Sequence, residues 1–174
     1  MSADGFVAGP NGTLDWMTWN WDDKLKSFVN EMHANVDTIL LGRKMTEGFV
    51  GHWESVKPGN PEYDFARIMV DTPKVIFTKT LDKPVGKNTT LAKGNLTEEI
   101  AYLKRQNGKD IIVYGGATFV SNLIKENLID ELNLFINPTT LGEGLSIFTK
   151  RTNLKLLKSL VFDCGIVVNT YQPS

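Results

Sequence analysis

The sequence predicts an α/β fold in one domain, with a mostly parallel central sheet, flanking helices and an antiparallel C-terminal hairpin. Apolar, β-branched runs alternate with segments of helical periodicity between residues 22 and 125, as in folds built on parallel strands. The last two apolar runs, 155–162 and 165–171, are joined by a tight turn at Asp163-Cys164. So short a connection joins antiparallel strands. A length of 174 residues is enough for one domain with a sizeable core.

Composition and charge narrow the possible partners. Hydrophobic residues make up 41% of the chain and charged residues 22%, a balance typical of globular proteins. The net charge of −1 shows no basic surplus, so we expect no nucleic-acid partner. No apolar run approaches the roughly 20 residues that a membrane helix needs, so we expect no membrane partner and no signal peptide. The single cysteine, Cys164, fits a cytoplasmic location.

The N-terminal part of the chain contains one clear helix. A short apolar stretch, 6–8, is followed by a turn at residues 9–12, where proline and Asn-Gly favour a change of direction. The segment 22–36 is amphipathic, and Asp22 or Asp23 can cap its start. The apolar face of this helix consists of Leu25, Phe28, Val29 and Met32.

Strands and helices then alternate. We expect a buried strand at 37–42 with a helix starting directly after it, and a second helix at 61–70. A strand follows at 74–78 and a helix at 96–108, with Thr97 near its cap and Asn107-Gly108 at its end.

A double glycine marks the next strand-to-helix corner. The apolar run at 111–113 leads into Gly115 and Gly116, and helical spacing begins at once over 117–127. Two successive side chains are therefore absent where the strand ends, which indicates that another group approaches the backbone closely. A further strand is expected at 131–136.

Three strand ends contain the features that could bind a ligand. Ligands of open parallel sheets bind beyond the carboxyl ends of the strands, and here these ends are 42–44, 78–80 and 115–118. Two of the three open helices, whose free N–H groups attract anions, and two carry basic residues. These features indicate a dinucleotide as the ligand. Each corner alone is explained as well by the need of the chain to turn, and the G-x-G-x-x-G fingerprint is absent.

The motifs at these corners resemble a known family. "DTILLGRKMTE", "KVIFTKTL" and "IIVYGGATFVSNLI" occur in the order seen in dihydrofolate reductases and in the C-terminal reductase domain of the bifunctional riboflavin biosynthesis protein, and "SADGFVAGPNGTLDW" is similar to the opening of the latter. The chain is most similar to small single-domain bacterial members. The resemblance implies a dihydrofolate-reductase-like three-layer fold over residues 1–174, NADPH as cofactor and a homodimer.

The resemblance also implies which residues bind the cofactor. The strand ends would hold the pyrophosphate, the adenosine and its 2′-phosphate, and three N-terminal residues would lie near the nicotinamide. The double glycine would let the cofactor lie against the backbone, and the peptide bond between Gly115 and Gly116 would be cis. The implied residues are Val7, Ala8, Trp16, Gly42, Arg43, Lys44, Met45, Thr46, Phe77, Thr78, Lys79, Thr80, Tyr114, Gly115, Gly116, Ala117, Thr118 and Phe119.

The substrate side matches less well. His33 stands where the riboflavin reductases typically carry an arginine that binds the substrate phosphate, and Tyr114 stands where they tend to carry a glutamate. The interpreted substrate residues are Trp16, Asp22, His33 and Trp53, with Asp4 as a general acid. Each has a structural alternative: a turn residue for Asp4, an N-cap for Asp22, core packing for the tryptophans. One cysteine and two histidines provide no metal site.

These observations predict an NADPH-dependent reductase that transfers hydride to a C=N or C=O bond of a small heterocyclic substrate. The ribosylaminouracil reductase of riboflavin biosynthesis and dihydrofolate reductase are the named candidates. The alternative is an NADP-binding sensor or interaction module without turnover. In the resembled families the S-x-D-G stretch ends a central strand, so we also expect that strand to begin upstream of Met1.

Overall fold

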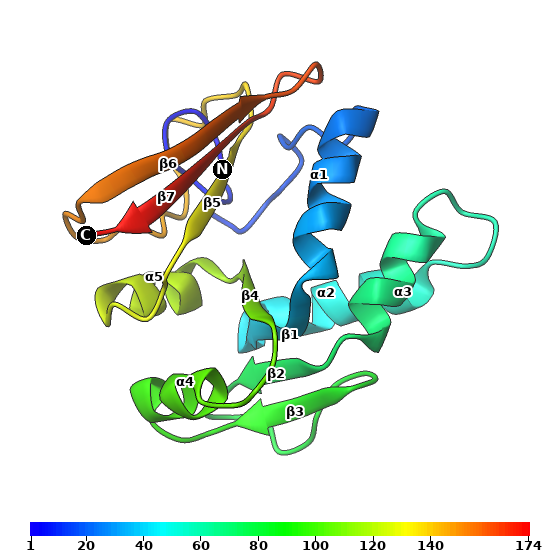
Figure 1. Ribbon diagram of the computed structural model, residues 1–174, viewed down its shortest axis with the longest axis vertical. Helices are drawn as coiled ribbons and strands as arrows, with labels where there is room; N and C mark the ends of the chain where they lie inside the picture. Colours follow the sequence, from blue (N-terminus) through cyan, green and yellow to red (C-terminus); the bar gives the residue numbers. More distant parts are fainter. The chain divides into compact units, whose positions relative to one another are not determined.

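The computed structural model describes all residues, 1–174, and they form two compact units (Figure 1). Unit 1 comprises Met1–Val29 and Val120–Ser174, and unit 2 comprises Asn30–Phe119. Two helices, α1 (Asp23–Ala34) and α5 (Ala117–Lys125), begin in one unit and end in the other. None of the helices is long and apolar enough to cross a membrane.

Unit 2 is built on a parallel sheet of strand order β3-β2-β1-β4. The central strand, β1 (Val36–Gly42), is buried from Ile39 to its end, because it has neighbours on both edges and helices on its faces. Its last residues pair with the ends of both neighbouring strands, so the three carboxyl ends lie together at one edge. The other strands are β2 (Lys74–Phe77), β3 (Thr89–Ala92) and β4 (Asp110–Gly115).

Helices α2 (Arg43–Ser55) and α3 (Tyr63–Asp71) supply the core of unit 2. Val50 and Met69 pack with Ile39 and Leu41 of β1, and all four are nearly inaccessible to solvent. Partly buried aromatic side chains of both helices surround this cluster. The remaining helix, α4 (Leu96–Lys104), begins at Asn95, whose side-chain oxygen accepts from the first free N–H groups.

Unit 1 contains an antiparallel sheet of order β5-β7-β6. Its strands are β5 (Leu132–Ile136), β6 (Leu154–Val161) and β7 (Val167–Pro173). Gly165 has a φ of +91° in the turn between β6 and β7, a conformation that favours glycine. The first half of α1 covers one face, where the Phe28 ring lies 6.2 Å from that of Phe135 and 5.9 Å from that of Phe162.

The predicted α/β architecture is confirmed, with local corrections. The C-terminal hairpin is part of a three-stranded sheet, since β5 joins it. Strand β3 was not predicted, because four residues with two threonines carry too little apolar signal. The short apolar stretch at 6–8 contributes an isolated bridge between Ala8 and Leu145. Helix α4 ends at Lys104, before the predicted Asn107-Gly108, because the Asp37 carboxylate accepts from the Lys109 N–H at 2.6 Å and directs the chain into β4.

The predicted cis bond between Gly115 and Gly116 is wrong, since every peptide bond is trans. The two glycines instead turn the chain with φ values of +132° and +86°. Both values lie where residues with a Cβ atom are strained, so glycine provides the turn without an isomerised bond.

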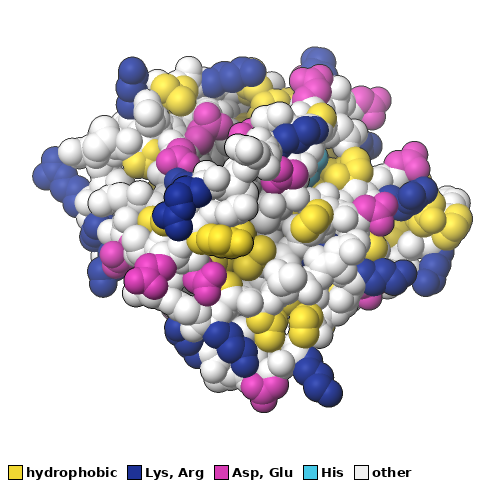
Figure 2. Space-filling view, turned by 60° about the horizontal axis from the view of Figure 1, so that its bottom comes forward, with side chains coloured by type: hydrophobic (Ala, Val, Ile, Leu, Met, Phe, Trp, Pro, Cys, Tyr) yellow, Lys and Arg dark blue, Asp and Glu magenta, His cyan; other side chains and the backbone are white.

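Basic and acidic side chains are interspersed over the side of the molecule that Figure 2 brings forward, where β3 and α4 lie.

One lysine is buried, unlike these surface cations. Lys74, at the start of β2, is only 2% exposed, and its Nζ donates to the carbonyls of Met69, Val70 and Thr72 at 2.7–2.9 Å. It therefore satisfies the free carbonyl groups at the end of α3. Desolvation lowers the pKa of Lys74, opposed by the charges of Glu54 and Asp71.

We expect Lys74→Met to lower the free energy of unfolding by about 2 kcal/mol, because buried carbonyls at a helix end would lose their donor. Met keeps the aliphatic stem, so packing is largely retained. Chemical denaturation should be compared with Lys57→Met at an exposed position of the same unit. Equal stability of the two variants would contradict a capping role. Because the folded pKa is lowered, the unfolded chain binds more protons between that pKa and 10.5, and this lysine's contribution to stability rises with pH there.

Candidate functional site

The three predicted strand ends meet in unit 2. Gly42 pairs with Phe77 across β1 and β2, and Leu41 pairs with Gly115 across β1 and β4. A Cβ atom on Gly116 would lie 3.9 Å from the Cα of Gly42. The structure thus brings together the corners 42–46, 77–80 and 114–119 within one compact unit.

Gly42 is required by the close approach of α5. A Cβ atom at this position would lie 2.8 Å from the Cβ of Phe119, closer than real side chains come. The Phe119 ring in turn packs on Phe77, with 4.9 Å between centroids. The missing side chains at Gly115 and Gly116 follow from their positive φ angles. The glycines therefore serve first to pack the corners against one another.

Two helix N-termini lie at these corners without a side-chain cap or an acidic residue. Gly42 precedes α2 in an extended conformation and makes no side-chain cap, and the first turns of α2 and α5 contain no carboxylate. Their first N–H groups therefore remain available, and the helix dipoles add partial positive charge. Arg43 and Lys44 are exposed and form none of the ion pairs of the structure. This combination suits a phosphate group.

Several predicted polar contacts are already occupied. Lys79 Nζ donates to the carbonyls of Lys93 and Gly94, both at 2.8 Å, and so connects the end of β2 to the loop after β3. Thr78 Oγ1 accepts from two N–H groups of the following turn, and Thr46 Oγ1 donates to the carbonyl of Gly42. These side chains hold the corners in shape. The free charge is that of Arg43 and Lys44.

The predicted substrate residues His33 and Trp53 lie in an aromatic cluster of unit 2. His33 is 4% exposed, and its Nε2 is hydrogen-bonded to the hydroxyl of Tyr114. Both His33 and Trp53 contact Phe65 edge-on, at centroid distances of 5.1 and 5.4 Å. Burial raises the pKa of Tyr114, so its hydroxyl stays protonated at neutral pH. No sequence signal reveals this pair, whose members are 81 residues apart.

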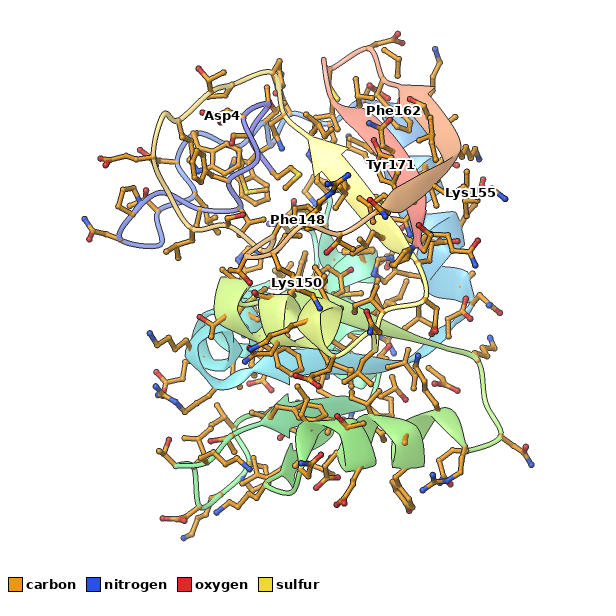
Figure 3. All side chains as sticks on the ribbon, turned by 90° about the vertical axis from the view of Figure 1, so that its left-hand side faces the viewer. Asp4, Phe148, Lys150, Lys155, Phe162 and Tyr171 are labelled. Carbon is orange, nitrogen blue, oxygen red and sulfur yellow. The ribbon has the colours of Figure 1, made fainter.

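Asp4 and the nearby residues of the opening segment belong to unit 1, where Asp4 lies beside the loop at 139–145 (Figure 3). Its carboxylate accepts from Ser2 Oγ at 2.6 Å, from the Gly142 N–H at 2.7 Å and from the Leu141 N–H. The hydroxyl of Ser2, followed by the Gly142 N–H, lowers the pKa of Asp4. A carboxylate held in its ionised form does not donate a proton at neutral pH, so this geometry opposes the predicted general acid and favours a loop-fixing role.

Asp22 is the N-cap of α1, as the alternative interpretation had it. One oxygen accepts from the Leu25 N–H and the other from the Cys164 N–H, both at 2.9 Å. These two bonds, that of Leu25 first, lower the pKa of Asp22. They attach the helix start to the β6–β7 turn and occupy both oxygens that a substrate would need.

The tryptophans do not form one platform. Trp21 stacks on Phe135 with centroids 6.4 Å apart, whereas Trp19 is 63% exposed. Trp16 Nε1 donates to the Thr13 carbonyl within its own loop. Trp53 belongs to the other unit.

The remaining predicted residues of unit 1, Val7 and Ala8, pair with Leu145 through two backbone bonds of 2.8 Å. Asn137 was missed from the sequence although it is 1% exposed and its Oδ1 accepts from the Thr18 N–H at 2.9 Å. It fixes the tryptophan-bearing loop. Its position between a strand and Pro138 was the only available signal.

The model of the RibD C-terminal domain family matches residues 1–168. The chain is 32% identical over 174 residues to the uncharacterized protein YyaP of Bacillus subtilis, covering 98% of this chain and 90% of that one.

Solved structures agree in fold. A putative riboflavin biosynthesis protein from Shewanella sp. PV-4 superimposes with a TM-score of 0.74 at 24% identity, over 100% of this chain and 95% of that one. Dihydrofolate reductase from Enterococcus faecalis, complexed with NADP(H), gives a TM-score of 0.60 at 19% identity, over 100% and 92% of the two chains. With the family model matching almost the whole length, the chain belongs to the RibD C-terminal domain family.

Proposed function

We propose that this protein is an NADPH-dependent reductase acting on a small heterocyclic substrate. The observation that carries the proposal is the meeting of two uncapped helix N-termini with the free cations Arg43 and Lys44 at one edge of a parallel sheet. That edge is where α/β proteins bind nucleotides. Family membership and the likeness to a dihydrofolate reductase complexed with NADP(H) support the same cofactor.

Each corner would bind a different part of the cofactor. The first N–H groups of α2 and α5 would bind the pyrophosphate, beside the Gly115–Gly116 backbone. Arg43 and Lys44 would read the 2′-phosphate that distinguishes NADPH from NADH. The bound nicotinamide supplies the hydride, so the chain itself has to position the rings and exclude competing reactions.

The substrate is proposed as a heterocycle with a reducible C=N or C=O bond. Family membership supports the ribosylaminouracil reductase of riboflavin biosynthesis, and the fold also supports a dihydrofolate-reductase type. His33 is buried among aromatic rings and is bonded to the hydroxyl of the partly buried Tyr114, so this pair offers no free charge to a substrate phosphate. We therefore rank heterocycles without a phosphate equally with the phosphorylated uracil. A cytoplasmic reductase fits the single free cysteine.

The test is cofactor binding and turnover measured separately. We expect NADPH to bind, as seen by nicotinamide fluorescence, and to be oxidised with a pterin, a ribosylaminouracil phosphate or a generic carbonyl compound. Binding without oxidation across that panel would favour the alternative, a sensor or interaction module. Failure to bind NADPH at all would contradict both readings.

Arg43→Ala should weaken NADPH binding by about tenfold, because an exposed charge-assisted contact contributes at the lower end of 1.5–3 kcal/mol. NADH binding should barely change, since that cofactor lacks the 2′-phosphate. The preference for NADPH should also decrease as salt rises. Both cofactors should be titrated at two salt concentrations, with Arg105→Ala, at the exposed end of α4, as the control. An equal loss for NADPH and NADH would assign Arg43 to the pyrophosphate or to the fold.

We also propose that two copies associate through β6. This strand is an edge of its sheet, and Leu156, Leu157 and Val161 on it are 54%, 48% and 77% exposed. An edge strand can pair antiparallel with its own copy about a twofold axis, which would bring these side chains beside those of the second copy. Sedimentation at micromolar concentration should give a dimer, and Val161→Lys should shift it to monomer while Lys155→Gln does not. A wild-type monomer would reject the proposal.

A further inference from the structure

Five aromatic side chains of unit 2 form a closed circuit. In order around it they are His33, Tyr114, Phe49, Trp53 and Phe65, and the successive centroid distances are 5.6, 5.1, 6.3, 5.4 and 5.1 Å. They come from the end of α1, from β4, from α2 and from α3. The circuit therefore links β4 to the helix whose N-terminus forms another corner of the site.

Tyr114 occupies an irregular position in the sheet. Leu40 pairs with Val113, but the next residue, Leu41, pairs with Gly115, so Tyr114 is an extra residue on β4. A bulge of this kind is uncommon between parallel strands and redirects the backbone that follows it. Here the backbone that follows is the Gly115–Gly116 turn, where both residues have positive φ. The turn therefore follows directly after a residue that is unpaired in the sheet.

The hydroxyl of Tyr114 anchors this part of the chain through His33. Phenylalanine would fill the same aromatic space, so packing alone does not require the hydroxyl. The bond to His33 Nε2 adds direction, because it fixes the ring and the bulged backbone in one position. Either atom can be the donor, depending on the tautomer of the imidazole. His33 is 4% exposed, so water does not compete readily for this bond.

We propose that Tyr114 and His33 are positioning residues, whose hydrogen bond holds the bulged end of β4 so that the Gly115–Gly116 turn and the start of α5 face the cofactor. This inference rests on the proposed function only for the identity of the ligand. The geometric part concerns the bulged end of β4, residues 111–115, and is measurable without a cofactor.

The experiment compares Tyr114→Phe with wild type by amide hydrogen exchange and by NADPH titration. Exchange at the β1-paired amides of residues 111–115 should become about tenfold faster, the factor that one lost hydrogen bond carries, while Leu41 and Ile76 in the core remain unchanged. NADPH affinity should fall by a similar factor. Tyr102→Phe, at a tyrosine that is 57% exposed, is the matched control and should change neither quantity. If Tyr114→Phe does not fold, His33→Phe serves in its place. His33→Gln, whose amide can still hydrogen-bond to the Tyr114 hydroxyl, should then cause a smaller change in exchange and affinity.

The outcomes separate the two proposals. A lower unfolding midpoint with unchanged exchange at residues 111–115 would make the pair merely structural and would overturn the inference. Faster exchange in the variant, combined with a wild type that binds no NADPH, would contradict the proposed function and still confirm the positioning role. Faster exchange with unchanged NADPH affinity would overturn the link to cofactor binding.

Discussion

The contact between Gly42 and Phe119 is the constraint on which the candidate site depends. Because a Cβ atom at Gly42 would lie 2.8 Å from that of Phe119, α5 can start beside β1 only when this side chain is absent. The approach seats Phe119 on Phe77 and aligns the ends of the three adjacent strands. The N–H groups of two helices then lie at the same edge of the sheet. Close packing of the backbone thus forms the proposed anion site, before any side chain takes part.

The regular elements could be predicted because each is encoded by neighbours in sequence. Strand β1, for example, contains the apolar run 39–41 and ends in glycine, and Asp22 caps α1 from directly before it. The missed features depend on distant partners. The His33–Tyr114 bond joins residues 81 apart, and Asp4 accepts from N–H groups 137 and 138 residues away. No local periodicity reports such contacts, and for this reason the sequence indicated that the three strand ends lie together but not the hydrogen bonds of Asp4 and His33.

The aromatic cluster holds α2, α3 and β4 together through contacts between rings rather than through charged groups. The circuit contains the hydrogen bond between His33 and Tyr114 and contacts between ring faces and edges, which contribute about 0.5–1.5 kcal/mol each beyond the area they bury. Such contacts tolerate small shifts, whereas the hydrogen bond does not. The aromatic rings therefore stabilise the arrangement of α2, α3 and β4, and the polar pair selects one position within it.

The predicted charged site residues fall into two groups: some are already hydrogen-bonded within the protein, and others keep a free charge. Asp4 and Asp22 have lowered pKa values and every oxygen engaged by backbone or hydroxyl donors, and Lys79 is bonded to two carbonyls. These residues fix loops. Arg43 and Lys44 alone among the predicted charged site residues keep their charge free, and both suit an anion. If reduction requires a proton, carboxylates held in the ionised form do not supply it near neutral pH.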